Sequence, residues 1–220
     1  MKDIKAGVIT FPGSNCDRDI QFILERFFYI PTKILWHHNT FNENEYDLLV
    51  LPGGFSYGDY LRCGAIARFS KAMQSLFEHV KKDKPVIGIC NGFQILCEAK
   101  LLPGALIRNI HLLHIAKDVP LIKGNSELFK DLNDVYNIPV SHSEGNYRVD
   151  EETLKELIDE QRIAFYYKEN PNGSIHNIAG ILSKNKKILG MMPHPERATD
   201  PINGKTDGYI ILKAILDHLL

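Results

Sequence analysis

A stretch near the middle of the chain, residues 86–96, reads VIGICNGFQIL. Its first part is apolar and rich in β-branched residues, which favours a buried strand, and its last part carries apolar residues at helical spacing. Glycines stand two positions before and two positions after Cys90. This pattern is typical of a nucleophile elbow, a sharp strand-to-helix turn where a nearby side chain would collide. We therefore predict a strand over residues 86–90 and a helix over residues 91–99.

Apolar runs and amphipathic stretches also alternate before this elbow. Strands are expected at residues 4–10, 32–36 and 46–51, and helices at residues 17–28 and 70–82. Such alternation implies βαβ crossovers and a parallel sheet with helices on both faces. After the elbow we expect strand-like stretches at residues 106–122, 138–149, 175–182 and 187–192, and helices at residues 151–160 and 208–220. We predict a single α/β domain over residues 1–220, with a mostly parallel central sheet and an antiparallel excursion.

Composition excludes several classes of protein. The chain has 220 residues, of which 44% are hydrophobic and 24% charged, and no apolar run approaches the roughly 20 residues that a membrane span needs. Lysine and arginine total 26 against 27 acidic residues, so no net field favours binding to nucleic acid. Residues 1–5 lead directly into a strand without a secretory signal, which predicts a cytoplasmic protein with four free cysteines.

A cysteine nucleophile needs a base and a third group that orients the base. Cys90 would begin a helix, where the positive end of the helix dipole favours a thiolate. Residues 191–197, MMPHPER, follow an apolar strand, and the two prolines favour an extended backbone. Because residues i and i+2 of an extended segment point the same way, we expect His194 and Glu196 to lie side by side. Taken alone, the elbow could also hold a structural cysteine.

A third element could stabilise the oxyanion that forms when a thiolate attacks an amide. Residues 48–54, LLVLPGG, read as a strand that ends in a glycine turn. Backbone N–H groups at such a strand end can stabilise developing negative charge. The candidate donors are the N–H groups of Gly54 and Asn91. A tight turn that needs glycine is the simpler interpretation, and the two are compatible.

These segments together resemble the triad (class I) glutamine amidotransferases, a family with a flavodoxin-like α/β architecture. The resemblance is carried by GICNGFQ at residues 88–94, PGGFSYGD at residues 52–59 and PHPER at residues 193–197. Further segments resemble the small glutaminase subunits of that family: FPGSNCD at residues 11–17, YLRCGAIA at residues 60–67 and NPNGS at residues 170–174. The resemblance spans nearly the whole chain in order.

The resemblance implies a set of roles. Cys90 corresponds to the nucleophile, His194 to its base, Glu196 to the orienting acid and Gln94 to a substrate contact. L-Glutamine would be hydrolysed through a glutamyl thioester. The ammonia would pass to a separate synthetase subunit, which uses ATP to convert formylglycinamide ribonucleotide to the amidine in purine biosynthesis. A small adaptor subunit often completes such complexes.

One segment departs from the family pattern, which usually reads His-Gly-Glu-Gly. This chain has Ser143 in place of the first glycine. If that glycine supplies a positive φ, the serine side chain would strain the loop.

Other motifs are set aside. NGKT at residues 203–206 ends like a phosphate-binding loop, but Thr199 stands where the earlier glycine is needed, so ATP and Mg²⁺ are expected on the partner and no cofactor on this chain. No cysteine or histidine pair has zinc-site spacing, which predicts no metal. The cysteines at positions 16, 63 and 97 have no elbow, and the lysines at residues 81–84 and 184–187 are expected to be solvated.

Two rival functions stay open at this point. A cysteine hydrolase or peptidase of similar architecture would cleave peptides rather than release ammonia and glutamate. A non-catalytic regulatory subunit would carry a vestigial triad, although the intact Cys, His and Glu argue against it.

Overall fold

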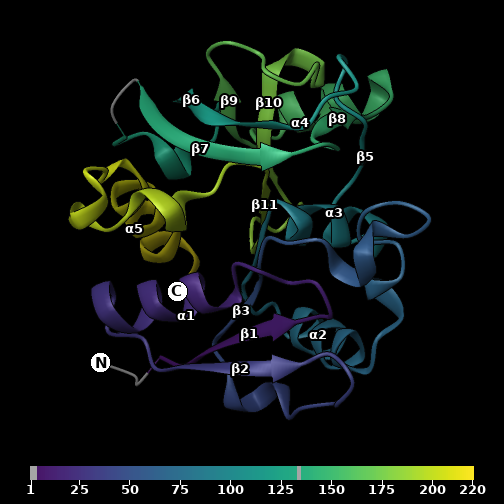
Figure 1. The fold of residues 1–220 in the computed structure, drawn as a ribbon, viewed down its shortest axis with the longest axis vertical. Coiled ribbons are helices and arrows are strands. Elements are labelled where there is room, and N and C mark those ends of the chain that lie inside the picture. The colour runs from purple at the N-terminus through teal and green to yellow at the C-terminus, as the bar shows by residue number, and fades with distance from the viewer. Residues whose placement is uncertain (1–3, 133–134) are drawn as a thin grey trace.

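A computed structural model of the chain describes residues 4–132 and 135–220, so most of the segment 1–5 that was read for a signal lies outside the described residues. The described strands form one nine-stranded sheet and a separate two-stranded sheet. Figure 1 shows the large sheet running through the molecule from β2 at one end to β6 and β7 at the other.

The large sheet has a parallel half and an antiparallel half. Its strand order is β2-β1-β3-β4-β11-β10-β9-β6-β7. The first five strands are parallel, and every pairing from β11 to β7 is antiparallel. The strands are β1 (Ala6–Thr10), β2 (Thr32–Trp36), β3 (Leu48–Leu51), β4 (Val86–Ile89), β6 (Ile115–Lys123), β7 (Tyr136–His142), β9 (Ile163–Tyr167), β10 (Ile178–Leu182) and β11 (Ile188–Met191). The predicted mostly parallel sheet with an antiparallel excursion is confirmed.

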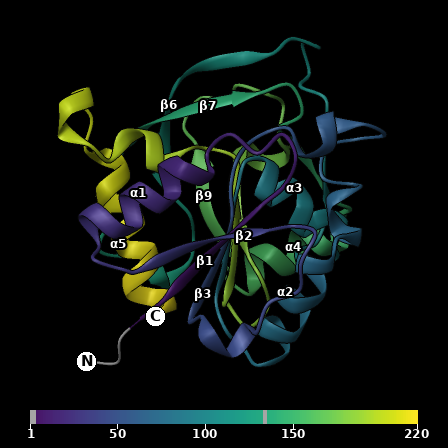
Figure 2. The same cartoon turned by 60° about the horizontal axis from the view of Figure 1, so that its bottom comes forward.

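Helices cover both faces of the sheet. The helices are α1 (Asp17–Phe27), α2 (Lys71–Lys81), α3 (Asn91–Glu98), α4 (Glu151–Asp159) and α5 (Asp207–Leu219). Figures 1 and 2 both place α1 and α5 on one side of the sheet and α2 and α3 on the other. Strands β1, β3, β4, β10 and β11 are buried along their whole length. None of the described helices is long and apolar enough to cross a membrane.

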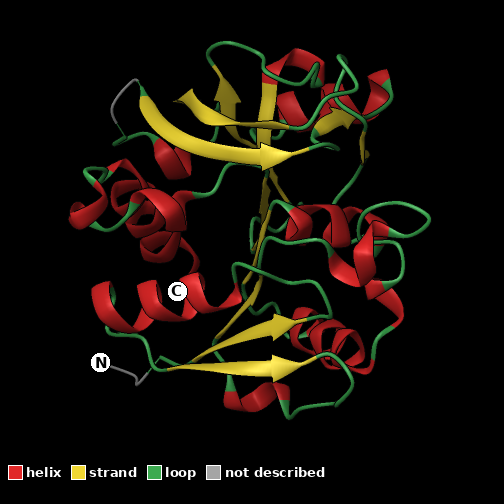
Figure 3. Cartoon of the chain, viewed as in Figure 1, coloured by secondary structure: helices red, strands yellow, loops and turns green. Residues whose placement is uncertain are grey.

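Three local expectations were wrong or incomplete. Strand β9 was not predicted, although its sequence IAFYY is β-branched and aromatic. The strand expected at residues 175–182 begins only at Ile178, because His176 and Asn177 have positive φ angles that a strand cannot contain. The strand-like region after α3 divides, since β5 (Ala105–Ile107) and β8 (Asn146–Arg148) pair with each other as the separate two-stranded sheet that Figure 3 shows in yellow.

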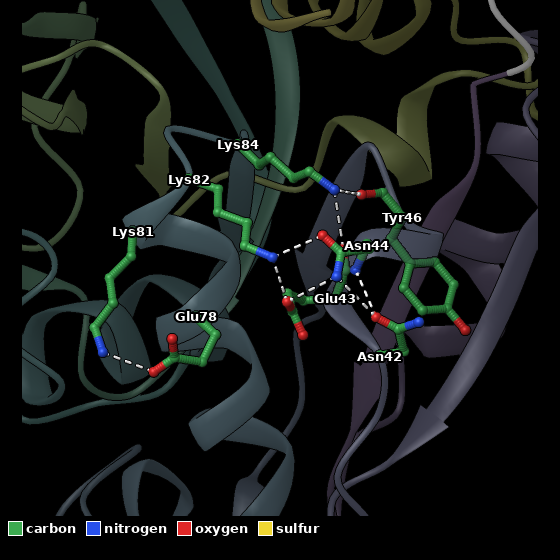
Figure 4. Close-up of polar contacts among 8 residues, drawn as sticks. All are labelled: Asn42, Glu43, Asn44, Tyr46, Glu78, Lys81, Lys82 and Lys84. Carbon is green, nitrogen blue, oxygen red and sulfur yellow. Dashed lines mark hydrogen bonds and ion pairs between the residues drawn. The ribbon is translucent and has the colours of Figure 1, made fainter.

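The lysines at the end of α2 do more than face solvent. Lys82 donates a hydrogen bond to the Glu43 carboxylate at 2.6 Å, as Figure 4 shows. Lys84 donates to the backbone carbonyls of Glu43 and Tyr46 at 3.0 and 2.8 Å. The two side chains therefore attach the segment that enters β3 to the segment that enters β4. The expectation that the whole cluster at residues 81–84 is merely solvated is corrected.

Candidate active site

The candidate site lies where neighbouring parallel strands end. Strands β3, β4 and β11 are adjacent in the sheet, and their carboxyl ends lead into Gly53, Cys90 and His194 respectively. The backbone N–H of Cys90 donates to the carbonyl of Met191 at 2.7 Å, which ties the elbow to the strand that carries the histidine. The carboxyl edge of a parallel sheet is where such folds place their ligands.

The elbow has the geometry that its glycines predict. Cys90 has φ 51° and ψ −105°, a strained conformation for a residue with a side chain. A Cβ atom on Gly92 would lie 2.0 Å from the carbonyl oxygen of Leu51, and one on Gly88 would lie 2.7 Å from the carbonyl oxygen of Gly92. Both positions therefore need glycine for close backbone approach, and α3 begins directly after Cys90.

His194 and Glu196 lie side by side, but not on an extended segment. The imidazole Nδ1 and the carboxylate Oε1 are 2.6 Å apart, and both residues are buried. Residues Pro195–Ala198 form a short 3₁₀ helix, η6, so the expectation of an extended backbone through Glu196 is wrong. Proline fixes a φ angle that suits the first turn of a helix, and this turn brings the carboxylate back to the ring.

The charges around His194 favour its protonated form. Burial alone lowers the pKa of His194, but the Glu196 carboxylate and Cys90 outweigh burial and raise the pKa well above that of free histidine. Because Nδ1 faces Glu196, the nitrogen left for Cys90 is Nε2, which is buried and has no hydrogen-bond partner among the described residues. The structure thus brings the three predicted residues together, with His194 between an acid and a thiol. Their catalytic roles stay predictions.

Neither candidate oxyanion donor is engaged in a hydrogen bond among the described residues. Within residues 4–132 and 135–220, the backbone N–H groups of Gly54 and Asn91 donate no hydrogen bond. Gly54 lines the cavity beside Cys90 and has a φ of 148°, which residues with a side chain rarely adopt. A Cβ atom at this position would lie 2.6 Å from the carbonyl oxygen of Gly13. The turn after β3 therefore requires glycine and also leaves the N–H group of that glycine free.

A cavity of about 450 Å³ opens next to Cys90. Its lining residues are Gly54, Phe55, Asp59, Cys63, Cys90, Gln94, Arg108, Leu112, Ser141, His142, Ser143 and Glu144. The residues from position 108 onward come from the antiparallel part of the chain, and except for the segment around Ser143 no sequence motif indicated them. The cavity therefore has one wall that contains Cys90, at the ends of the parallel strands, and a second wall from residues that are distant in sequence.

The predicted substrate contact, Gln94, lines this cavity, but its amide is already engaged. Its Nε2 donates to the Glu144 carbonyl at 2.6 Å, and its Oε1 accepts from the Asn91 side chain at 2.9 Å. Gln94 therefore positions the loop that contains Glu144. That loop is not strained at Ser143, which is absent from the residues with positive φ. The serine hydroxyl instead lies 3.0 Å from His114 Nδ1.

Charged groups of both signs face the cavity. The Arg108 guanidinium lies 3.9 Å from the Glu144 carboxylate, and the Glu144 carboxylate also accepts from the Cys63 backbone N–H at 3.5 Å. Burial and the nearby Glu144 charge raise the pKa of Asp59. Burial and the Asp59 carboxylate also raise the pKa of the Cys63 thiol, so Cys63 stays protonated and is a poor nucleophile.

The chain is similar to proteins of known family. Residues 3–207 match the family described as CobB/CobQ-like glutamine amidotransferase domain. The protein named "Phosphoribosylformylglycinamidine synthase subunit PurQ" of Trichormus variabilis is 49% identical in an alignment of 222 residues that covers 99% of this chain and 99% of that protein. The protein of the same name from a strain of Prochlorococcus marinus is 51% identical over 220 residues, covering 98% of this chain and 99% of that protein.

Solved structures agree with these similarities. A chain in the structure of PurLQS from Thermotoga maritima is 36% identical, with a TM-score of 0.87 and coverage of 99% of this chain and 100% of that one. A further glutamine amidotransferase from Thermotoga maritima has a TM-score of 0.61 at 18% identity, with coverage of 100% and 93%, and it bears on the fold alone.

Proposed function

Because the chain belongs to the CobB/CobQ-like glutamine amidotransferase family and to its PurQ subunits, we propose that Cys90, His194 and Glu196 release ammonia from L-glutamine. The chain is the glutaminase subunit of phosphoribosylformylglycinamidine synthase, an enzyme of purine biosynthesis, and it acts with the PurL subunit. The observation that carries the proposal is the buried contact between His194 Nδ1 and Glu196 beside a cysteine held on a strained elbow.

The reaction follows from this geometry. His194 Nε2 takes the proton of the Cys90 thiol, and the sulfur attacks the side-chain amide carbon of glutamine. The N–H groups of Gly54 and Asn91 stabilise the resulting oxyanion, each by several kcal/mol in a typical site. The carbon–nitrogen bond then breaks, and the nitrogen leaves as ammonia with the proton from His194. Water attacks the thioester, His194 takes its proton, and glutamate is released as the thiol re-forms.

The cavity suits the amino-acid end of glutamine. Glu144 and Asp59 offer carboxylates to an ammonium group, while Arg108 offers a guanidinium to a carboxylate. A cavity of about 450 Å³ can hold glutamine with Cys90 at one end. We propose that these charges orient the α-carbon of the substrate and that Gln94 holds the Glu144 loop in place.

The synthetase half of the reaction belongs to partners. We propose that ammonia passes to PurL, that ATP and Mg²⁺ bind there, and that a small PurS subunit completes the complex. The NGKT segment supports this division, because its Lys205 ammonium lies 2.6 Å from the Asp118 carboxylate and is not free for a phosphate.

Replacement of the nucleophile tests the proposal. In the complex reconstituted with PurL and PurS, Cys90→Ala should abolish synthesis from glutamine and leave synthesis from ammonium salt nearly unchanged. Cys97→Ser is the matched control, because this buried thiol lies on α3, the helix that begins directly after Cys90, but does not line the cavity. Loss of both activities in Cys90→Ala would assign Cys90 a structural role. Cleavage of peptides without ammonia release would favour the rival hydrolase.

A further inference from the structure

A second group of potential ligands lies behind the catalytic histidine. The Sγ atom of Cys16, a ring nitrogen of His194 and a carboxylate oxygen of Glu196 all lie within 4.8 Å of one another. Cys16 immediately precedes α1, whereas the other two residues follow β11. All three side chains are buried. Because Cys16 is so distant from the other two in sequence, the spacing of cysteines and histidines could not indicate this cluster.

The chemistry of the cluster suits a divalent zinc-like cation. Thiolate sulfur, imidazole nitrogen and carboxylate oxygen are the usual zinc ligands. Zinc bonds of about 2.0 Å to nitrogen and about 2.3 Å to sulfur place tetrahedral ligand atoms roughly 3.5 Å apart. The Cys16 Sγ and His194 Nδ1 atoms are 3.9 Å apart, so only small side-chain movements would be needed.

Two further observations point to a ligand at this place. The Oε2 atom of Glu196 is buried and has no hydrogen-bond partner among the described residues, although the residue is only 3% exposed. A buried carboxylate oxygen without a partner is costly unless something binds it. A separate cavity of about 320 Å³ reaches Glu196 and is lined also by Asp19, Asp200 and Arg197. Its carboxylates outnumber its one guanidinium, which favours the entry of a cation.

We propose that Zn²⁺, or a divalent cation of similar ligand preference, binds Cys16 Sγ, His194 Nδ1 and Glu196 Oε2 and inhibits the enzyme. Binding displaces the thiol proton of Cys16 and the Nδ1 proton of His194 into solvent, while the metal keeps its charge and forms three bonds. A neutral imidazole bound through Nδ1 carries its proton on Nε2. The metal then replaces the contact between His194 Nδ1 and the Glu196 carboxylate, so the imidazole loses the group that orients it toward Cys90.

Arg197 opposes metal binding. Its Nη2 atom donates to Cys16 Sγ at 2.9 Å, so the guanidinium occupies the position next to the sulfur and repels a cation there. The side chain is 36% exposed and has Asp19 as a second partner at 3.9 Å, so it can turn outward. Removal of this cation should therefore strengthen metal binding, whereas removal of Cys16 should weaken it.

Binding is tested first, without reliance on activity. Co²⁺ is titrated into the full-length Cys90→Ala protein, in which cobalt cannot bind the nucleophile. The thiolate-to-cobalt absorption is recorded, and Zn²⁺ is then added to displace the cobalt. The absorption should appear, should be lost in the Cys16→Ser/Cys90→Ala protein, and should persist in the Cys63→Ser/Cys90→Ala control. Arg197→Leu in the Cys90→Ala background should lower the cobalt dissociation constant. Absence of thiolate absorption in Cys90→Ala, or its persistence without Cys16, would overturn the site.

Inhibition is tested second, and this step alone rests on the proposed function. In the reconstituted complex, Zn²⁺ should inhibit synthesis from glutamine more strongly than synthesis from ammonium salt. Cys16→Ser should raise the zinc concentration for half-inhibition by about tenfold or more, measured against the variant's own zinc-free rate. An unchanged inhibition midpoint in Cys16→Ser would overturn the inhibitory role, even if the cobalt site exists. A wild-type complex without glutamine-dependent activity would instead contradict the proposed function.

Discussion

The buried side chain of His142 should make the free energy of unfolding depend on pH, and this dependence can be measured. The side chain is 3% exposed, its Nδ1 lies 3.2 Å from the Asn109 side-chain oxygen, and its Nε2 has no partner among the described residues. Burial, followed by the charges of His194 and His114, lowers the pKa of His142 to about 3. The perturbation is His142→Gln, which keeps a donor for Asn109 and removes the titrating group.

The sign and size of the effect follow from the two pKa values. An unfolded histidine has a pKa of about 6.5, so between about pH 3 and 6.5 the unfolded chain binds a proton that the folded chain does not. Neutral His142 therefore makes its full contribution to the free energy of unfolding above about pH 6.5, and this contribution is lost as the pH falls below that value. The loss is about 1.4 kcal/mol per pH unit, or about 2 kcal/mol between pH 6.5 and pH 5.

Urea unfolding of the wild type and of His142→Gln over this pH range measures the difference. The variant should be less stable at neutral pH, because its side chain fills the site less well, but its deficit should shrink by about 2 kcal/mol at about pH 5. The other histidines are common to both proteins and cancel in the comparison. A deficit that stays constant with pH would refute the argument, since His142 would then carry the same proton in both states.

Three further changes test the elbow, the triad and the cavity. Glu196→Gln keeps the shape of the side chain but not its charge, so ammonia release should fall by roughly 10³- to 10⁴-fold with an unchanged circular dichroism spectrum; a loss below tenfold would contradict an orienting role. Gly92→Ala places a Cβ atom 2.0 Å from the Leu51 carbonyl, and thermal unfolding should show a destabilisation of about 1–3 kcal/mol; an unchanged melting temperature would show that the elbow can relax. Gln94→Leu removes the hydrogen bond to the Glu144 carbonyl, so the KM for glutamine should rise about tenfold while the use of ammonium is unaffected; equal losses in both assays would indicate general unfolding.

Short-range patterns predicted the parallel half of the fold well. The elbow at Cys90 depends on contacts made by glycines within two residues of it, and the strand at residues 32–36 has the bounds that its apolar pattern predicts. Strand β9 is buried and could have been found from its composition alone. Glu196 was placed beside His194 for the wrong local reason, because the two prolines favoured an extended segment where the backbone forms a 3₁₀ turn.

Long-range packing explains why the rest of the site escaped prediction. Cys16 and Arg197 stand far apart in the chain, yet their side chains are 2.9 Å apart. The contact depends on the packing of α1 against η6, and no local pattern encodes that arrangement. Arg108 and Glu144 likewise reach the cavity only because β5 and β8 pair. Local chemistry therefore indicated the reactive groups but not the wall that faces them.

The two halves of the sheet divide the work of the site. The parallel strands end in the residues proposed as the nucleophile, the oxyanion donors and the base, and backbone contacts such as the 2.7 Å hydrogen bond from Cys90 to Met191 hold them in place. The antiparallel half supplies the opposite wall, and the backbone N–H of His194 donates to the Pro139 carbonyl of β7 at 2.8 Å. A shift of β7 would therefore move the base and the substrate wall together. Substitutions in this half should change how glutamine is held before they change the chemistry of the thiol, because the elbow itself rests on β3 and β4.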